Sequence, residues 1–462
     1  MRMKKLFIVL TIIIPVIVHA QPYGSKYPPL DYWWMNVGTA GFSAGGAKYT
    51  DLVFSLAGEP YVVYQDAGNA EKASVMKYNG TNWISVGQAG FSADSVEYTS
   101  IAFTLSGQAY VAYSDRGYSN KVTVMKYNGT EWTNVGNAGF SSSDASEINL
   151  AISSTGEPYV AFRDNSYEQK ATVMKYDGTA WMAVGSAGFS SGLVHYLSFS
   201  ISSANQLYVA YQDYGNLQKA SVMRYNGSNW ELVGTAGFTS GKAICISLAF
   251  EQSGQPFVAY SDETNAYKLS VMKFDGANWV QVGSPGASSG FIEYTSLVFS
   301  PDHQPYVAFE DYGEEGKAAV MKFNGSDWVY VGTDGFTPGG ADYTSLAFGQ
   351  DNRPYVAFAD DENDGKATLM KYDSSLVGTG EPEIQGLFLY PNPVTSRLTI
   401  NCKNAKGILR FVEIYDGSGN KTFTAQSIDN EIIINVKDLS AGLYIVRINT
   451  EGGDWHGKFC KK

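Results

Sequence analysis

The sequence has few of the residues from which covalent, metal and nucleic-acid sites are usually built. It holds three cysteines and four histidines in 462 residues, and its 33 basic residues are outnumbered by 45 acidic ones. Three cysteines are too few for a disulfide framework in a chain of this length, and the histidines lack the spacing of a zinc site. The acidic balance argues against nucleic acid as a partner, because a negative surface repels phosphate backbones.

Long apolar runs are also missing, except near the N-terminus. Basic residues within the first five positions precede an apolar segment from Leu6 to Val18, and a small-residue cleavage pattern ends at Ala20. We interpret residues 1–20 as a secretory signal peptide. Its removal would take away three positive charges and move the formal net charge from −12 to −15. No later run reaches about 18 consecutive apolar residues, so we expect no membrane-spanning helix in the mature chain.

Tryptophan, by contrast, recurs seven times at a constant spacing of 49 residues. The positions are Trp34, Trp83, Trp132, Trp181, Trp230, Trp279 and Trp328. Each repeat contains four short runs with the alternation or β-branching of strands, separated by turn residues. A fixed period of this length with four strands predicts one blade of a β-propeller. We therefore predict an all-β chain with a seven-bladed propeller at residues 31–374.

The order of the runs also predicts how the propeller closes. The chain begins with a tryptophan run, and its last repeat, from Tyr343 to Tyr372, has none after it. We expect the N-terminal strand to complete the seventh blade, which removes the free edges of an open stack. Within a repeat, the pair Asn79-Gly80 separates the third and fourth runs and predicts a two-residue type I′ hairpin.

Each repeat carries an aspartate followed six residues later by a lysine, as in Asp66 and Lys72. The two residues fall at the ends of one hairpin loop. A cross-strand ion pair is the simplest interpretation of this spacing. Seven copies favour a structural role over a single functional site.

The repeat ends after Tyr372, and residues 375–386 have the composition of a linker. Alternating runs in residues 387–462 predict a small Ig-like β-sandwich. This module holds Cys402 and Cys460, which could pair after export, whereas sequence alone cannot supply the geometry that a disulfide needs.

Four motifs of this module stand in order at the end of the chain. They are Tyr390-Pro391-Asn392-Pro393, the turn from Ile414 to Gly419, the segment from Leu439 to Tyr444, and Lys461-Lys462. In these motifs the module resembles the type A C-terminal sorting domain of cargo of the type IX secretion system of Bacteroidota. The resemblance implies an interaction with the type IX secretion machinery and passage across the outer membrane. It leaves open whether the mature protein is released or anchored at the surface.

The repeats themselves are similar to a propeller-like repeat of large exported proteins of the same bacteria, a group without one established activity. The loops between the second and third strands vary most, and variable loops on a rigid scaffold commonly bind ligands. Five of the seven loops contain a tyrosine, a side chain that can stack on a sugar ring. The predicted ligand-binding residues are Tyr118, Tyr167, Tyr214, Tyr267 and Tyr312.

We therefore expect a monomeric binding or adhesion protein that recognises a glycan or a protein surface. The alternative is a glycoside hydrolase or lyase, for which acids outside the repeat pattern, such as Glu147, Glu293 and Glu314, are candidates. None of them stands in a catalytic motif, so no catalytic residue is assigned. We expect no cofactor, although the acidic loops at 311–315 and 360–364 could hold calcium instead of being solvated hairpins.

Overall fold

The computed structural model describes residues 34–373, 388–390, 394–401, 409–416, 421–426, 431–440, 442–450 and 453–461. The chain divides into two compact units, of which one is Tyr32–Gly380 and the other contains Glu381–Lys462. The predicted signal peptide and linker lie outside the described residues.

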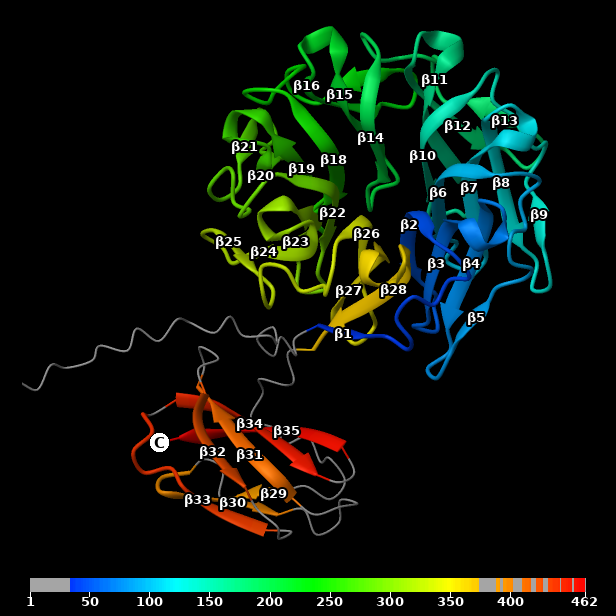
Figure 1. Ribbon diagram of the computed structural model, residues 1–462. Coiled ribbons are helices and arrows are strands. Elements are labelled where there is room, and N and C mark those ends of the chain that lie inside the picture. Colours follow the sequence, from blue (N-terminus) through cyan, green and yellow to red (C-terminus); the bar gives the residue numbers. More distant parts are fainter. Residues whose placement is uncertain are drawn as a thin grey trace, which may run out of the picture. The chain divides into compact units, whose positions relative to one another are not determined.

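The first unit is a seven-bladed propeller of four-stranded antiparallel sheets (Figure 1). The innermost strands are β2 (Ala47–Phe54), β6 (Val96–Phe103), β10 (Ala145–Ile152), β14 (Val194–Ile201), β18 (Ala243–Phe250), β22 (Ile292–Phe299) and β26 (Ala341–Phe348). The second strands are β3 (Pro60–Asp66), β7 (Ala109–Asp115), β11 (Pro158–Asp164), β15 (Leu207–Asp213), β19 (Pro256–Asp262), β23 (Pro305–Asp311) and β27 (Pro354–Asp360). We number the blades 1 to 7 in this order.

Two further strands complete each blade. The third strands are β4 (Lys72–Tyr78), β8 (Lys121–Tyr127), β12 (Lys170–Tyr176), β16 (Lys219–Tyr225), β20 (Lys268–Phe274), β24 (Lys317–Phe323) and β28 (Lys366–Tyr372). The outermost strands are β5 (Trp83–Ser85), β9 (Trp132–Asn134), β13 (Trp181–Ala183), β17 (Trp230–Leu232), β21 (Trp279–Gln281), β25 (Trp328–Tyr330) and β1 (Trp34–Asn36). As predicted, β1 pairs with β28 and closes blade 7.

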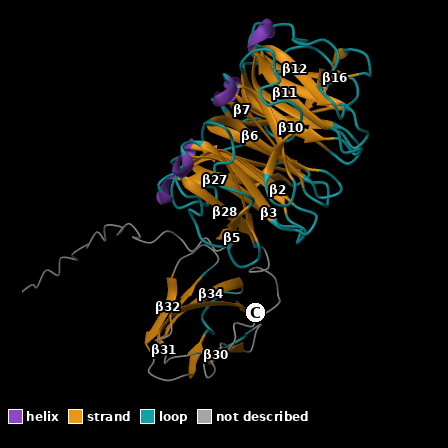
Figure 2. Ribbon diagram, turned by 90° about the vertical axis from the view of Figure 1, so that its right-hand side faces the viewer, coloured by secondary structure: helices purple, strands orange, loops and turns teal. Residues whose placement is uncertain are grey.

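A short 3-10 helix joins the second and third strands of every blade. These helices are η1 (Ala67–Asn69), η2 (Arg116–Tyr118), η3 (Asn165–Tyr167), η4 (Tyr214–Asn216), η5 (Glu263–Asn265), η6 (Tyr312–Glu314) and η7 (Asp361–Asn363). All lie on one face of the propeller, which we call the helix face (Figure 2).

The core lies between neighbouring blades, and the tryptophans join them. Trp83 Nε1 donates to the carbonyl of Val37, and its ring stacks on Phe42 with centroids 3.7 Å apart. In the following blades too, the tryptophan donates to the carbonyl of a valine 46 residues earlier in the sequence, as Trp132 does to Val86. Trp34 Nε1 donates to the carbonyl of Val331, so this series of bonds runs around the whole propeller. Each indole thus buries a large apolar surface and satisfies its only donor.

Two local predictions need correction. The third and fourth strands are joined by four residues, Asn79–Asn82, because Asn79 Oδ1 accepts the backbone N–H groups of Thr81 and Asn82. A type I′ turn needs positive φ at both central residues, whereas in this loop only Gly80 has positive φ (92°). The predicted type I′ turn was therefore wrong.

The repeated aspartate and lysine do face each other in register, as Asp66 and Lys72 show. The carboxylate, however, is buried and bonds its own loop. Asp66 accepts from Gly68 N, from Asn69 Nδ2 at 2.7 Å and from Ser74 Oγ at 2.8 Å. It acts as the N-cap of η1, since a short side-chain oxygen can satisfy the free N–H groups of the first turn.

The second unit is a sandwich of two antiparallel sheets. One sheet has the order β29 (Phe388–Tyr390), β30 (Arg397–Asn401), β33 (Glu431–Asn435). The other has the order β32 (Lys421–Gln426), β31 (Leu409–Tyr415), β34 (Gly442–Thr450), β35 (Gly453–Lys461). Leu398, Val412 and Ile448 are among the fully buried side chains between the sheets. Cys402 lies outside the described residues, so its pairing with Cys460 stays a prediction.

Candidate functional site

Every innermost strand begins with a β-bulge on the helix face. In blade 1, Tyr49 and Thr50 together oppose the single residue Tyr64, and Tyr49 has φ of 54°. An extra residue bends a strand and redirects the side chain at that point. The bulge residues of all seven blades have φ between 49° and 55°, and we call them the ring residues. They are Tyr49, Tyr98, Glu147, Tyr196, Cys245, Tyr294 and Tyr343.

The ring residues meet around the axis of the propeller. The Tyr49 ring lies 5.0 Å from Tyr98 and 5.1 Å from Tyr343, and Tyr343 lies 4.7 Å from Tyr294, measured between centroids. Burial raises the pKa of each of these phenols, and it raises that of Tyr196 to about 12. The phenols therefore remain neutral hydrogen-bonding groups at physiological pH.

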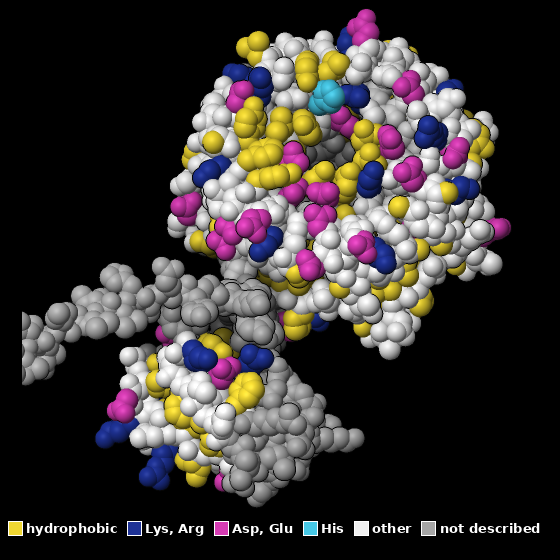
Figure 3. Space-filling model, in the orientation of Figure 1, with side chains coloured by type: hydrophobic (Ala, Val, Ile, Leu, Met, Phe, Trp, Pro, Cys, Tyr) yellow, Lys and Arg dark blue, Asp and Glu magenta, His cyan; other side chains and the backbone are white. Residues whose placement is uncertain are grey.

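Figure 3 shows the helix face, where hydrophobic and acidic side chains surround a central hollow. We call this region the axial mouth. The mouth contains side chains from all seven blades, but their chemistry differs from blade to blade. The two ring positions that lack tyrosine hold Glu147 and Cys245. Burial raises the pKa of the Cys245 thiol to about 12, which leaves it an unreactive, neutral group.

One sector of the mouth carries a linked acid and base, which we call the basic sector. Glu147 accepts from the backbone N–H of Leu197 at 2.8 Å, and its other oxygen lies 2.9 Å from His195 Nδ1. Arg163 Nη1 lies 3.0 Å from His195 Nε2 and 3.8 Å from the Glu147 carboxylate. The Tyr214 ring packs 5.3 Å from the imidazole. These side chains come from blades 3 and 4.

A second sector, in blades 6 and 7, carries only acids, and we call it the acidic sector. Glu293 and Glu310 are cross-strand partners in blade 6, and Asp342 occupies the position of Glu293 in blade 7. Burial and the neighbouring carboxylates of Asp342 and Glu293 raise the pKa of Glu310 to about 8. Burial also raises the pKa of Glu293 and of Asp342. A proton is therefore held among these groups near neutral pH.

The two sectors occupy equivalent positions of the repeat. In blade 3 the cross-strand pair at the bulge is Ser146 and Arg163, and His195 follows in blade 4. In blade 6 the same pair is Glu293 and Glu310. The same repeat position on the second strand thus holds a cation, Arg163, in blade 3 and a carboxylic acid, Glu310, in blade 6.

The structure separates the five predicted tyrosines into two groups. Tyr214, beside His195, and Tyr312 lie next to the mouth, since the Tyr312 hydroxyl is 3.4 Å from Glu293 Oε2. Tyr267 and Tyr312 both contact Phe291, with centroids 5.8 and 5.1 Å away. Their part in binding stays a prediction.

The other two tyrosines lie apart from this group. Tyr118 packs against Gly139 and Tyr167 against Gly188, both in the segments that leave their own blades. Their exposed fractions, 43% and 44%, match that of Tyr214 at 43%, so exposure alone does not distinguish the groups. What distinguishes them is the position in the loop, because Tyr118 and Tyr167 end their 3-10 helices and Tyr214 begins its helix.

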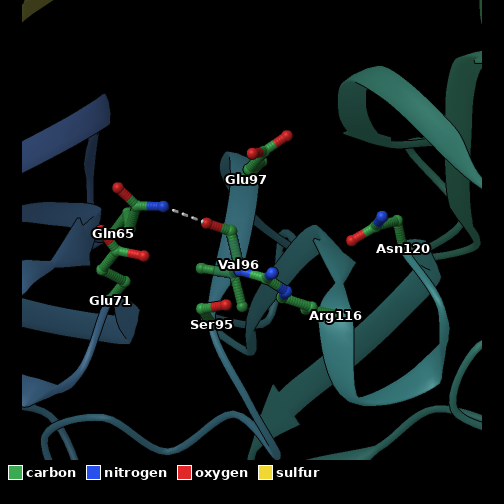
Figure 4. Close-up of a pocket in the computed structure, with 7 residues that line it drawn as sticks. All are labelled: Gln65, Glu71, Ser95, Val96, Glu97, Arg116 and Asn120. Atoms are coloured by element: carbon green, nitrogen blue, oxygen red, sulfur yellow. Dashed lines mark hydrogen bonds between the residues drawn. The ribbon is translucent and has the colours of Figure 1, made fainter.

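A small polar pocket opens between blades 1 and 2 beside the mouth. It has a volume of about 250 Å³ and contains Arg116 and Glu97, the residue before Tyr98 of the ring. Gln65 spans the two blades by donating to the carbonyl of Val96 at 2.5 Å (Figure 4). Its volume is below the roughly 300–1,000 Å³ of common ligand pockets, so we do not assign it a ligand of its own.

The acidic loops show no preformed calcium cage. Asp311 accepts from the backbone N–H groups of Gly290 and Gly313, and Asp360 accepts from Asn363 and Thr368. Among the described residues, no group of three acidic, histidine or cysteine side chains is arranged to hold a metal ion. Within the same residues, no helix is long and apolar enough to cross a membrane.

Of these residues, sequence reasoning named Glu147 and Glu293, as candidate acids of an enzyme, and it missed the ring tyrosines, Arg163 and Glu310. A signal was present, because the repeat position that precedes Thr50, Thr99, Thr295 and Thr344 is tyrosine in five of the seven repeats. The two ring positions without tyrosine are Glu147, which belongs to the basic sector, and Cys245.

The fold defines a seven-bladed β-propeller with a separate C-terminal module. That module is a type IX secretion sorting domain, since residues 388–462 match the family described as "Secretion system C-terminal sorting domain". As the sequence predicted, this domain indicates export to the cell surface or release. The comparison with curated proteins found no match.

Several solved structures share parts of the architecture. An ulvan lyase of polysaccharide lyase family PL25 aligns over 72% of this chain and 95% of its own, at 13% identity and a TM-score of 0.51. PorZ, a surface component of the type IX secretion system of Porphyromonas gingivalis, aligns over 91% of this chain at 14% identity and a TM-score of 0.48. This chain spans about three fifths (59%) of the PorZ chain. A fucose-specific lectin from Aleuria aurantia aligns over 63% of this chain and 98% of its own, at 16% identity and a TM-score of 0.43. At 13% identity, the alignment with the ulvan lyase shows a likeness of fold alone.

Proposed function

We propose that the propeller is a glycan-binding module of a secreted or surface-displayed protein, with the axial mouth as its binding site. The observation that carries this proposal is the tyrosines at five of the seven ring positions, of which Tyr98, Tyr49, Tyr343 and Tyr294 contact one another in that order. Tyrosine offers an apolar face for stacking and a hydroxyl for hydrogen bonds, which suits a ligand that is apolar on one face and polar at its rim. The sorting domain delivers this module to a surface where polysaccharides are accessible.

The surroundings of the ring support a polar ligand with charged groups. Arg163 and His195 on one side can donate hydrogen bonds, and the carboxyls of blades 6 and 7 can accept them. Tyr196 and Tyr214 are 41% and 43% exposed, so their rings are accessible from solvent.

A glycan and polysaccharide array probed with the purified protein tests this function. We expect selective binding that weakens about tenfold or more in a Tyr196→Ala/Tyr214→Ala variant, since stacked aromatic side chains dominate such contacts. Leu105→Ala, which removes an exposed side chain outside the mouth, is the control and keeps full binding. A Tyr118→Ala/Tyr167→Ala variant decides whether the outer tyrosines belong to the site. Binding to protein surfaces but to no glycan would replace this proposal by adhesion to a protein.

A polysaccharide lyase is the second candidate, and the basic sector favours it. Cleavage by elimination needs a cation near the uronate carboxylate and a base that removes the neighbouring proton. Arg163 and His195 could take these roles, although Glu147 already engages both. Formation of an unsaturated uronide from an acidic polysaccharide, lost in a His195→Ala variant, would establish the lyase. Binding without turnover would exclude it for the substrates on the array.

A further inference from the structure

The acidic sector brings three carboxyl groups together with no basic partner. Glu293 and Glu310 face each other across β22 and β23, and like charges in this position destabilise a sheet. Asp342 and Asp361 of blade 7 and Glu293 act on Glu310 through their charges. Among the described residues, no lysine or arginine forms an ion pair with Glu293, Glu310 or Asp342. The strands of the propeller thus hold these carboxyl groups close together although their negative charges repel one another.

Glu310 is the central group of the sector. Its side chain is only 4% exposed, and its Oε2 atom is buried without a hydrogen-bond partner. A buried carboxylate oxygen without a partner is costly, because it has lost its hydration and gained nothing in return. Blades 1 and 4 avoid this cost with a neutral side chain, Gln65 or Gln212, at the equivalent position.

Aromatic rings line the same sector. The Tyr294 and Tyr343 rings lie 4.7 Å apart beside Glu293 and Asp342 in the sequence, and Tyr312 stacks on Phe291. The negative faces of aromatic rings attract organic cations. Carboxylates with aromatic walls therefore suit an ammonium group better than a bare metal ion, and the arrangement lacks the three-ligand geometry of a metal site.

We propose that the acidic sector of the mouth binds the ammonium group of an amino sugar in a glycan chain. The inference rests on the proposed function, because it names the ligand class of the same mouth. The ammonium group donates to the half-buried carboxylates of Glu293 and Asp342, the buried Glu310 carboxylate balances its charge, and the sugar ring lies against the tyrosines. Three N–H donors match a site with several carboxylate acceptors.

Without ligand, a proton takes the place of the cation. The groups that face Glu310 are Glu293, Asp342, Asp361 and the hydroxyl of Tyr312, and together with burial the carboxylates raise its pKa to about 8. Binding of an ammonium ion opposes this shift, since a nearby positive charge favours the ionised carboxylate. The bound ligand thus supplies the positive charge that the chain itself lacks at this point.

Calorimetric titration with glucosamine oligosaccharides and with their N-acetylated counterparts of equal length tests the inference. The two probes differ in charge and in the acetyl group, and we expect the glucosamine form to bind about tenfold or more tightly. A Glu310→Gln variant is expected to lose this preference. The substitution should fold, because Gln65 and Gln212 already occupy this position. Glu157→Gln removes one charge from a hairpin outside the mouth and should leave the preference intact.

The outcomes separate this inference from the proposed function. Equal affinity for both probes, or a preference that survives in Glu310→Gln, would overturn the inference. Binding of other glycans in the array would then leave the proposed function in place. A calcium titration is the second arm, and binding of calcium that depends on Glu310 without any binding of glucosamine oligosaccharides would replace the amino sugar by a metal ion.

Discussion

At the scale of single residues, the mouth is defined by departures from the repeat. Tyrosine at the bulge is the repeated choice, whereas Glu147 occurs there once and organises His195 and Arg163 around its carboxylate. Glu310 likewise occurs once, where two other blades have glutamine. A side chain that every blade shares can be explained by the fold, but a side chain that one blade holds at a cost to stability calls for a functional reason.

Glu310 predicts how stability depends on pH. Its pKa is raised to about 8 in the folded protein, so the folded state binds this proton more tightly than the unfolded state does. The resulting stabilisation is complete below the unfolded pKa of about 4.3 and is lost as the pH rises to about 8. We expect the unfolding free energy of the propeller to fall between pH 5 and pH 8, and the melting temperature to fall with it. Each unit of difference between the folded and unfolded pKa corresponds to about 1.4 kcal/mol.

The Glu310→Gln variant supplies the control for this dependence. Glutamine does not titrate, so the decline in melting temperature should become shallower in the variant. The raised pKa values of Glu293 and Asp342 have the same sign and keep part of the decline. Scanning fluorimetry across this pH range measures both proteins, and identical slopes would show that Glu310 is already ionised in the folded state.

At the scale of single elements, each blade is ordered by a small number of repeated devices. The bulge aims one side chain at the axis, the tryptophan of the outer strand bonds the preceding blade, and in blades 1 to 6 the aspartate that ends the second strand caps the 3-10 helix. These devices use backbone groups that would otherwise stay unpaired. The loops of the helix face therefore have fixed geometry and can differ in sequence without loss of the blade.

The capping aspartate provides a test at this scale. Asp213 accepts from Gly215 N, Asn216 Nδ2 and Ser221 Oγ at 2.8 to 2.9 Å and is 1% exposed. We expect Asp213→Ala to lower the unfolding free energy by about 2–4 kcal/mol, since buried donors lose a charged acceptor. Urea denaturation followed by tryptophan fluorescence measures the loss.

The seventh blade offers the matched comparison. Asp360 is equally buried, but it makes no backbone capping bond and its Oδ1 atom has no partner. Asp360→Ala should therefore cost less than Asp213→Ala, by about 1 kcal/mol. Equal losses for the two variants would mean that burial of the carboxylate, and not capping, decides its contribution.

At the scale of the whole molecule, a closed ring turns seven similar units into one site. No blade alone has a mouth, because the ring residues of neighbouring blades supply its walls. Closure through β1 and β28 brings Tyr343 of the last blade against Tyr49 of the first. The sorting domain is a separate unit with its own core, which agrees with a role in export.

Removal of the sorting domain tests the division of labour. A chain that ends before residue 388, expressed in a bacterium with a type IX secretion system, should remain inside the outer membrane. The full chain should reach the surface or the medium, and fractionation with an antibody to the propeller measures the difference. Export of the truncated chain would show that residues 388–462 are dispensable for sorting.

The sequence by itself determined the architecture, because the signals for it are local and repeated. A constant 49-residue period, tryptophan in every unit and a missing last strand suffice to predict seven blades and their closure by the N-terminal strand. The sorting domain is similarly readable, since its motifs follow one another in order. The prediction of a type I′ turn at Asn79 was wrong, because more than one type of turn accommodates an Asn-Gly pair. The hydrogen bonds of the Asn79 side chain determine which type forms.

The candidate site was decided by the tertiary structure. Glu147, Arg163 and His195 are distant in the sequence and meet only because two neighbouring blades place equivalent positions side by side. The same holds for Glu310 and Asp342, whose pKa values are raised by burial and by neighbouring carboxylates, those of Asp342 and Glu293 for Glu310 and that of Asp361 for Asp342. Period and propensity act within a strand, whereas charge, burial and pairing depend on distances between strands, and only the closed ring sets those distances.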